Sequence, residues 1–79
     1  MQINIRLYGL LRDVLPPEKK GRDVIELPEG GTVQDLLTAV GIHRPCIAAV
    51  NEIHEADKDH VLQDGDKVVV FIQAAGGAI

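Results

Sequence analysis

An unbroken apolar run, VVVFI at Val68 to Ile72, constrains the fold of this chain more than any other feature. It follows an Asp-Gly turn within LQDGDKVVVFIQ, Leu62 to Gln73. Successive side chains of a strand point to opposite faces of its sheet, so this run is apolar on both faces, which favours a central position. The run therefore predicts a strand at the centre of a sheet.

Three further segments have the patterns of strands. From Gln2 to Tyr8, apolar residues alternate with polar ones, which is the period-2 pattern of a strand with one buried face. DVIEL, Asp23 to Leu27, ends at the turn-forming sequence PEGG, and CIAAV, Cys46 to Val50, is a short apolar run. We expect the first two strands to pair with each other. If the last strand is central and lies beside the first, its C-terminal end leaves the sheet at an edge of the domain.

Two helices are predicted between these strands. A short helix of about two turns is indicated by apolar residues at helical spacing before Pro16-Pro17, namely Leu10, Leu11, Val14 and Leu15. PPEKKG then reads as an exposed loop. The main helix follows Thr32, which forms an approximate capping box with Asp35, and it ends at Gly41. Its apolar stripe consists of Val33, Leu36, Leu37 and Val40.

The sequence thus predicts an α+β fold with a mixed four- to five-stranded sheet, one main helix and a short helix. A chain of 79 residues forms one domain. We expect residues 1–73 to be globular and residues 74–79 to form a flexible tail that contains Gly76-Gly77. An adjacent glycine pair does not stabilise a fold, because glycine loses the most backbone entropy on ordering. It is either mobile slack or a functional handle.

The charge of the chain argues against a nucleic-acid partner. The formal net charge is −4, whereas affinity for a phosphate backbone comes from clustered Lys and Arg side chains. The eight basic residues are scattered in the sequence, and only Lys19, Lys20 and Arg22 come close together, in a loop. An acidic domain would instead be attracted to a basic protein partner.

The cellular location is predicted from one cysteine and from the first residues. A single cysteine, Cys46, excludes an internal disulfide and fits a reducing compartment. MQINIRLYG has no continuous hydrophobic stretch of the kind found in a signal peptide or a membrane span. We expect a cytoplasmic protein that does not act at a membrane.

The order of these elements, with three motifs before a Gly-Gly pair, resembles the MoaD/ThiS family of ubiquitin-like (β-grasp) sulfur carrier proteins. The motifs and the ending are LPEGGTVQDLL (Leu27 to Leu37), AAVNE (Ala48 to Glu52), LQDGDKVVVF (Leu62 to Phe71) and AAGG (Ala74 to Gly77). Each motif is weak alone, but their order and spacing are fairly specific. The resemblance covers essentially the whole chain and implies the β-grasp fold.

The resemblance also implies a role for Gly77. In this family a ubiquitin-activating-like enzyme uses ATP to adenylate the C-terminal glycine, which becomes a thiocarboxylate and donates sulfur on a synthase. Here Ala78-Ile79 follow Gly77, so a JAMM-type peptidase would first have to remove them. Ala74, Ala75 and Gly76 would enter the partner's site, since the segment from Gln73 to Gly77 can reach about 13 Å when extended.

The implied function is that of a protein cosubstrate, not an enzyme, with no cofactor of its own. Sulfur would go to molybdopterin or tungstopterin, with thiamine as the next candidate. Two alternatives are open. A β-grasp domain that has left carrier chemistry would act as a noncovalent interaction module. A ubiquitin-like modifier would join Gly77 to lysines of other proteins.

Other side chains give weaker indications. Val69 and Phe71 are candidates for a docking surface, because two helices cover only one face of the sheet, although loops could cover the other face. Cys46, at the start of a strand, is expected to be a buried structural thiol. The spacings of His43, His54 and His60 match no metal-binding pattern. No nucleophile with a base and no phosphate-binding loop is found, so neither a catalytic residue nor a metal site is predicted.

Overall fold

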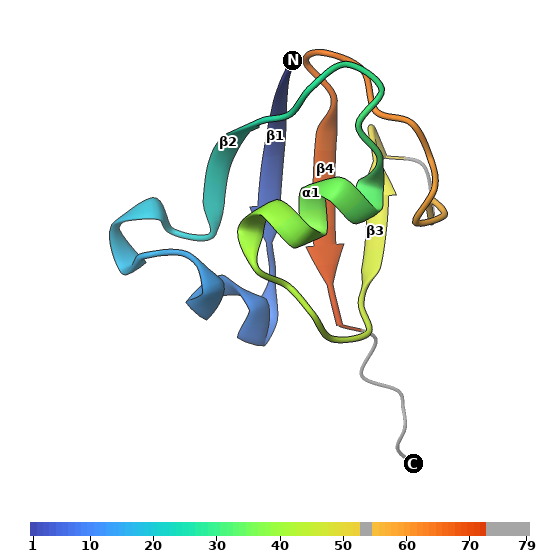
Figure 1. Cartoon of the computed structure of the whole chain (residues 1–79). Helices are drawn as coiled ribbons and strands as arrows, with labels where there is room; N and C mark the ends of the chain where they lie inside the picture. The colour runs from blue at the N-terminus through green and yellow to red at the C-terminus, as the bar shows by residue number, and fades with distance from the viewer. Residues whose placement is uncertain (53–54, 73–79) are drawn as a thin grey trace.

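A computed structural model of the chain describes residues 1–52 and 55–72, and in it one α-helix crosses one face of a four-stranded sheet (Figure 1). The elements follow in the order β1 (Gln2–Leu7), the 3-10 helices η1 (Gly9–Val14) and η2 (Pro17–Lys19), β2 (Arg22–Glu26), α1 (Val33–Val40), β3 (Ile47–Val50) and β4 (Lys67–Phe71). This is the predicted α+β architecture. The predicted boundary between the globular domain and the tail lies outside the described residues.

The sheet is mixed, with the strand order β2-β1-β4-β3. β1 pairs with β2 in the antiparallel sense and with β4 in the parallel sense, and β3 pairs with β4 in the antiparallel sense. The last strand is therefore central, which confirms the prediction made from its apolar run, and it lies beside the first. Val68 and Val70 of β4 are buried, while Val69 and Phe71 are half-buried on the opposite face.

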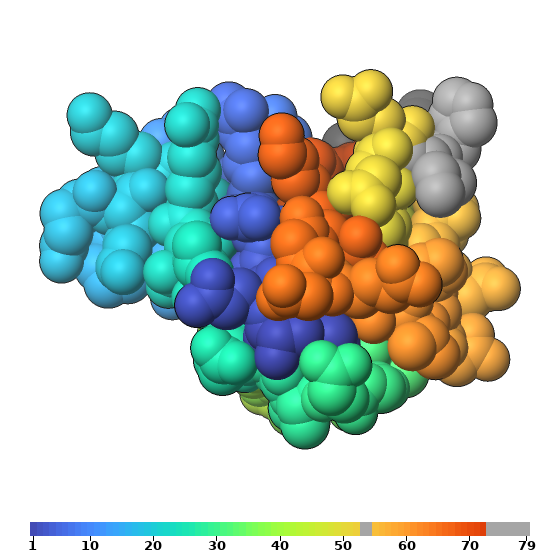
Figure 2. All heavy atoms as spheres, turned by 90° about the horizontal axis from the view of Figure 1, so that it is seen from above, coloured from blue at the N-terminus to red at the C-terminus, as the bar shows by residue number. Residues whose placement is uncertain are grey.

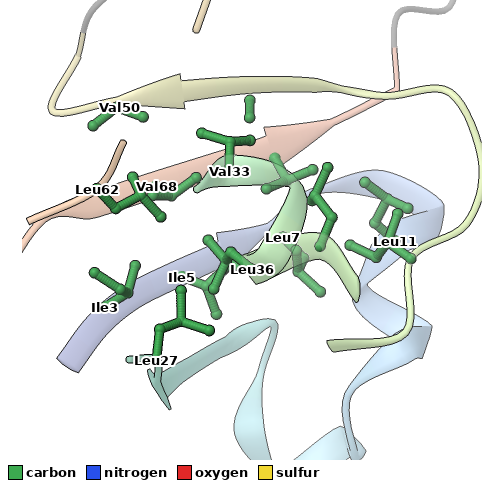
Figure 3. Packing of buried hydrophobic residues seen from close by; sticks show 14 of the residues in the cluster. Ile3, Ile5, Leu7, Leu11, Leu27, Val33, Leu36, Val50, Leu62 and Val68 are labelled. Atoms are coloured by element: carbon green, nitrogen blue, oxygen red, sulfur yellow. The ribbon is translucent and has the colours of Figure 1, made fainter. Parts of the chain in front are cut away.

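The core lies between the sheet and α1 (Figure 3). Ile3, Ile5 and Leu7 of β1 are buried and alternate with exposed residues, as the period-2 pattern predicted. They meet the buried side chains of α1, Val33, Leu36 and Leu37. Each such side chain contributes about 1.5–3 kcal/mol when it is fully removed from water. The fold is thus held by aliphatic packing.

All four backbone N–H groups in the first turn of α1 have partners. The carbonyls of His60 and Lys58 accept from Val33 and Gln34 at 3.0 and 2.8 Å. Thr32 Oγ1 accepts from the N–H of Asp35, Asp35 Oδ2 accepts from the N–H of Thr32, and the Thr32 carbonyl accepts from Leu36. The predicted capping box is confirmed, and so is the end at Gly41, which has a φ of 90°.

The segment between β1 and β2 differs from the prediction. The expected short helix is a 3-10 helix, η1, and a second one, η2, lies within the expected loop. The stretch between β1 and Pro16 is too short for an α-helix to be stable by itself, so tighter turns form where a few side chains anchor them. Leu11 and Leu15 are buried, whereas Leu10 is 70% exposed.

Two strand boundaries also differ from the prediction. β2 begins and ends one residue earlier than expected, at Arg22 and Glu26. β3 begins at Ile47, where pairing with β4 starts, and Cys46 precedes it. Cys46 is half-buried, so the prediction of a buried thiol was wrong. Its carbonyl lies outside the strand ladder and accepts from Lys58 Nζ at 3.2 Å.

Candidate functional site

The edge of the sheet at which β4 ends is the origin of the segment 73–79. Because β1 and β4 are parallel, their C-terminal ends lie at the same edge, and the N–H of Tyr8 donates to the carbonyl of Val70 at 3.1 Å. η1 therefore begins where β4 ends (Figure 1). The predicted functional tail, Ala74, Ala75, Gly76 and Gly77 with Ala78-Ile79 after it, lies outside the described residues.

The face of the sheet opposite α1 holds the predicted docking residues. Val69 and Phe71 are half-buried there, since the buried positions of β4 alternate with theirs. Ala49 and Ile47 of β3 lie directly opposite them in the register and are half-buried as well. We call these four residues the apolar strip.

The sequence analysis missed Ile47 and Ala49. The alternation within CIAAV places them on one face and Ala48 and Val50 on the other, but the pairing with β4 had to be known before that face could be identified. That the apolar strip is a docking surface stays a prediction, because its residues are only partly exposed.

The same face becomes polar toward β1 and β2. Arg6 lies beside Val69 in the parallel register and opposite Arg22 in the antiparallel one. A shallow depression runs across these strands, and Asn4, Arg6, Arg22, Val24 and Val69 are among its lining residues. A partner that covers this face would meet apolar side chains on β3 and β4 and cations on β1 and β2.

Basic side chains gather at the corner formed by β1, η1, η2 and β2, contrary to the expectation that only three lie together. Arg6, Arg12, Lys19, Lys20 and Arg22 line one concavity together with Leu7 and Tyr8. We call it the basic concavity. The turns after β1 and η1 bring Arg6 and Arg12 close to the other three cations. No local pattern in the sequence predicts this grouping.

The remaining candidate residues are not brought together. Among the residues that the structure describes, no three His, Cys, Asp or Glu side chains are grouped so as to hold a metal ion, and His54 lies outside that range. Within residues 1–52 and 55–72, no polar or charged residue is buried. The described part of the chain contains no helix with the length and apolarity needed to cross a membrane.

Solved structures similar to this chain share its fold. Two from Haloferax volcanii, of SAMP1 and of small archaeal modifier protein 1, superpose with TM-scores of 0.75 and 0.72 at 18% and 15% identity. The matches cover 98% and 90% of this chain and 100% and 95% of those chains.

Two further structures come from molybdopterin-converting factors. A putative subunit 1 from Pyrococcus furiosus is 25% identical with a TM-score of 0.73, over 91% of this chain and 97% of its own. A complex of subunits 1 and 2 from Helicobacter pylori matches with a TM-score of 0.64 at 18% identity, over 98% of this chain and 100% of that chain.

No curated protein sequence matches the chain. A family model does match, and its match extends from residue 5 to residue 77, through the strands, the helix and the glycine pair. It describes the ThiS family. The β-grasp, ubiquitin-like neighbours agree with the resemblance that the motifs indicated. This chain belongs to the ThiS family.

Proposed function

We propose that this protein is a sulfur carrier that is loaded at Gly77. The observation that carries the proposal is the family match, which continues beyond the globular body and ends at residue 77. Members of this family are small protein carriers. The protein would therefore be a cosubstrate that binds no cofactor of its own, and its activating partner would use ATP.

Loading requires a free carboxylate at Gly77, so the peptide bond to Ala78 has to be hydrolysed first. A JAMM-type peptidase is the proposed catalyst. The freed carboxylate oxygen then attacks the α-phosphorus of ATP on a ubiquitin-activating-like enzyme, forming an acyl adenylate and releasing pyrophosphate. A sulfide-level donor displaces AMP and leaves the thiocarboxylate. When a synthase transfers that sulfur to its substrate, water hydrolyses the bond between the Gly77 carbonyl carbon and sulfur, and Gly77 returns to the carboxylate form.

The geometry of the body supports this proposal. β4 lies between β1 and β3, so the segment that follows Ile72 starts from a central strand of the sheet. The apolar strip lies on that same strand and its neighbour. A partner that covers Val69 and Phe71 is therefore positioned to receive Ala74 to Gly77 in its active site. The partner has to stabilise the anionic intermediates, since the tail offers only backbone groups.

The acceptor of the sulfur is proposed from the relatives. One similar structure is a complex of subunits 1 and 2 of a molybdopterin-converting factor, which supports a second subunit as the partner at the acceptor step. We propose molybdopterin or tungstopterin synthesis in the cytoplasm as the pathway, with thiamine synthesis as the next candidate.

The intact mass of the protein purified from its own cells tests the proposal. We expect loss of Ala78-Ile79 and, in part of the population, replacement of one oxygen by sulfur. A uniformly full-length mass under conditions that demand the pathway would favour a noncovalent β-grasp module. A Gly77→Ala variant, with the unchanged protein as the control, should fold normally but fail to load. Normal loading of that variant would contradict the idea that the partner's active site accepts only a residue without a side chain at position 77.

Protein modification is the second candidate, because one of the similar structures is a small archaeal modifier protein. It uses the same activated Gly77 and differs only in the acceptor, a lysine amine in place of a metabolite. Peptide mass mapping separates the two functions. Trypsin cuts this chain after Lys67, so lysines of other proteins that carry an isopeptide-linked remnant of Val68 to Gly77 would establish modification. A thiocarboxylate without such remnants would establish the carrier alone.

A further inference from the structure

The stretch from the end of β1 to the start of β2 has a net charge opposite in sign to that of the rest of the protein. Residues 6–23 contain five basic and three acidic side chains, a net charge of +2. The other residues contain three basic and nine acidic side chains, a net charge of −6. The blue and cyan part of the chain lies at one flank of the molecule and the light orange part at the opposite flank (Figure 2). The protein is therefore electrostatically polar in spite of its acidic total.

The cations at this corner are mostly unpaired. Lys19 Nζ lies 3.3 Å from Asp23 Oδ1, an i,i+4 pair. Within the described residues, Arg6, Arg12, Lys20 and Arg22 form no salt bridge. Because these side chains are exposed, water and salt screen them while the protein is free. An anionic partner that displaced this water would find four positive charges available.

The backbone holds Arg12 in place at the concavity. Gly21 has a φ of +76°, and its carbonyl accepts from the N–H of Leu7 in β1 at 2.7 Å. A Cβ at Gly21 would lie 2.8 Å from the Leu7 carbonyl oxygen and 3.1 Å from Arg12 Cγ. The stem of Arg12 thus packs directly over the glycine backbone, so this guanidinium loses less freedom when it binds a ligand.

Apolar side chains are exposed on the same segment. Three of the five large apolar residues that are exposed among the described residues are Tyr8, Leu10 and Val14, which are 42%, 70% and 38% exposed. Tyr8 lies under the Arg6 guanidinium, 5.0 Å from ring centroid to Cζ. A site that binds small ions by charge alone does not require exposed apolar side chains. Cations on the same segment as exposed apolar side chains instead match a protein segment in which carboxylates alternate with apolar residues.

We propose that the basic concavity, with Tyr8, Leu10 and Val14, is a docking site for an acidic, partly apolar segment of a partner protein. A protein segment is favoured over nucleic acid or an anionic membrane because those polyanions extend beyond the site and would face the remaining net charge of −6. The site adjoins the sheet edge where β4 ends. It goes beyond the proposed function and does not depend on the loading of Gly77.

Binding of a short synthetic peptide with alternating pairs of glutamate and leucine tests this proposal. We expect amide chemical shift changes confined mainly to residues 6–22 in an NMR titration, and an affinity that falls as salt is raised. The same peptide with lysine in place of glutamate should not bind. The absence of any shift at low salt, or shifts centred on another surface, would overturn the proposal.

Two charge-reversal variants make the test specific. Lys20→Glu removes a cation of the concavity, and Arg44→Glu makes the same change of charge at an exposed residue outside it. We expect Lys20→Glu to weaken binding about tenfold and Arg44→Glu to leave it within about twofold. Arg12→Glu, checked for folding by its NMR spectrum, should act like Lys20→Glu. Equal losses in Lys20→Glu and Arg44→Glu would show that only net charge matters.

Two other anionic probes complete the experiment. Short duplex DNA and vesicles of anionic phospholipid should bind more weakly than the glutamate-leucine peptide at the same salt concentration. Tighter binding of either probe, lost in Lys20→Glu, would assign the basic concavity to nucleic acid or to a membrane surface and would overturn the proposal.

Discussion

The capping box of α1 makes a quantitative prediction about stability. Thr32 and Asp35 exchange two hydrogen bonds, from the N–H of Thr32 to Asp35 Oδ2 at 2.9 Å and from the N–H of Asp35 to Thr32 Oγ1 at 3.2 Å. Thr32→Ala removes the acceptor of the second bond. We expect a loss of about 1 kcal/mol in the free energy of unfolding. In a domain of this size that loss lowers Tm by about 4–8 °C.

Thr38→Ala is the matched control, because it makes the same chemical change inside the same helix. Thr38 is exposed, and its hydroxyl accepts a bond from the Gln34 side chain at 3.1 Å. Alanine has the higher helix propensity, by up to about 0.7 kcal/mol, so Thr38→Ala should be neutral or slightly stabilising. The two identical substitutions are thus expected to have opposite signs.

A double-mutant cycle shows whether the two bonds act as a unit. Asp35→Ala should cost about 0.5–1 kcal/mol, since it removes an acceptor and a negative charge near the helix N-terminus. Thr32→Ala with Asp35→Ala should cost about 0.5 kcal/mol less than the sum of the single changes. Urea denaturation followed by circular dichroism measures all three values. Equal effects of Thr32→Ala and Thr38→Ala would refute the assignment of the cap.

Three further predictions concern the core, the corner of the sheet and the docking face. Leu36→Ala should lower the free energy of unfolding by about 2–5 kcal/mol, whereas Leu10→Ala, at a position 70% exposed, should cost under about 0.5 kcal/mol in the same denaturation assay. Gly21→Ala should lower the free energy of unfolding by about 1–3 kcal/mol, because its positive φ and the contact at 2.8 Å both oppose a Cβ. Gly30→Ala should lower it less, because φ is also positive there but the space is open. Val69→Asp, at a half-buried position of a central strand, should lower the free energy of unfolding by about 1 kcal/mol, leave the protein folded, and weaken binding of the proposed adenylating partner at least about tenfold in calorimetry. Unaltered binding would move the docking surface away from the apolar strip.

The parts of the fold that the sequence predicted are those in which side-chain periodicity is decisive. β1 alternates strictly, and β4 is apolar at adjacent positions, so their burial and the central place of β4 followed from the pattern alone. The bounds of α1 followed from local chemistry at Thr32 and Gly41. In each case the determining groups are neighbours in the sequence.

The parts that it did not predict depend on contacts between distant residues. Whether the segment around Leu11 forms an α-helix or a 3-10 helix depends on how it is anchored to the core, and its own pattern suits both. The basic concavity needs Arg6 on β1 and Arg22 on β2 to face the same corner, which follows from the antiparallel register. Half of the apolar strip was missed for the same reason, since Ile47 and Ala49 acquire their neighbours only through pairing with β4.

The central place of β4 also links folding to the start of the segment in which we propose that loading occurs. β4 supplies ladder partners to both β1 and β3, so the sheet is not assembled until this last strand has inserted. The same strand leads through Ile72 into the segment with Gly76-Gly77. A misfolded copy therefore has neither an intact docking face nor a correctly placed start for that segment. A partner that binds the body before it processes the tail consequently checks the integrity of each molecule, without any separate proofreading step.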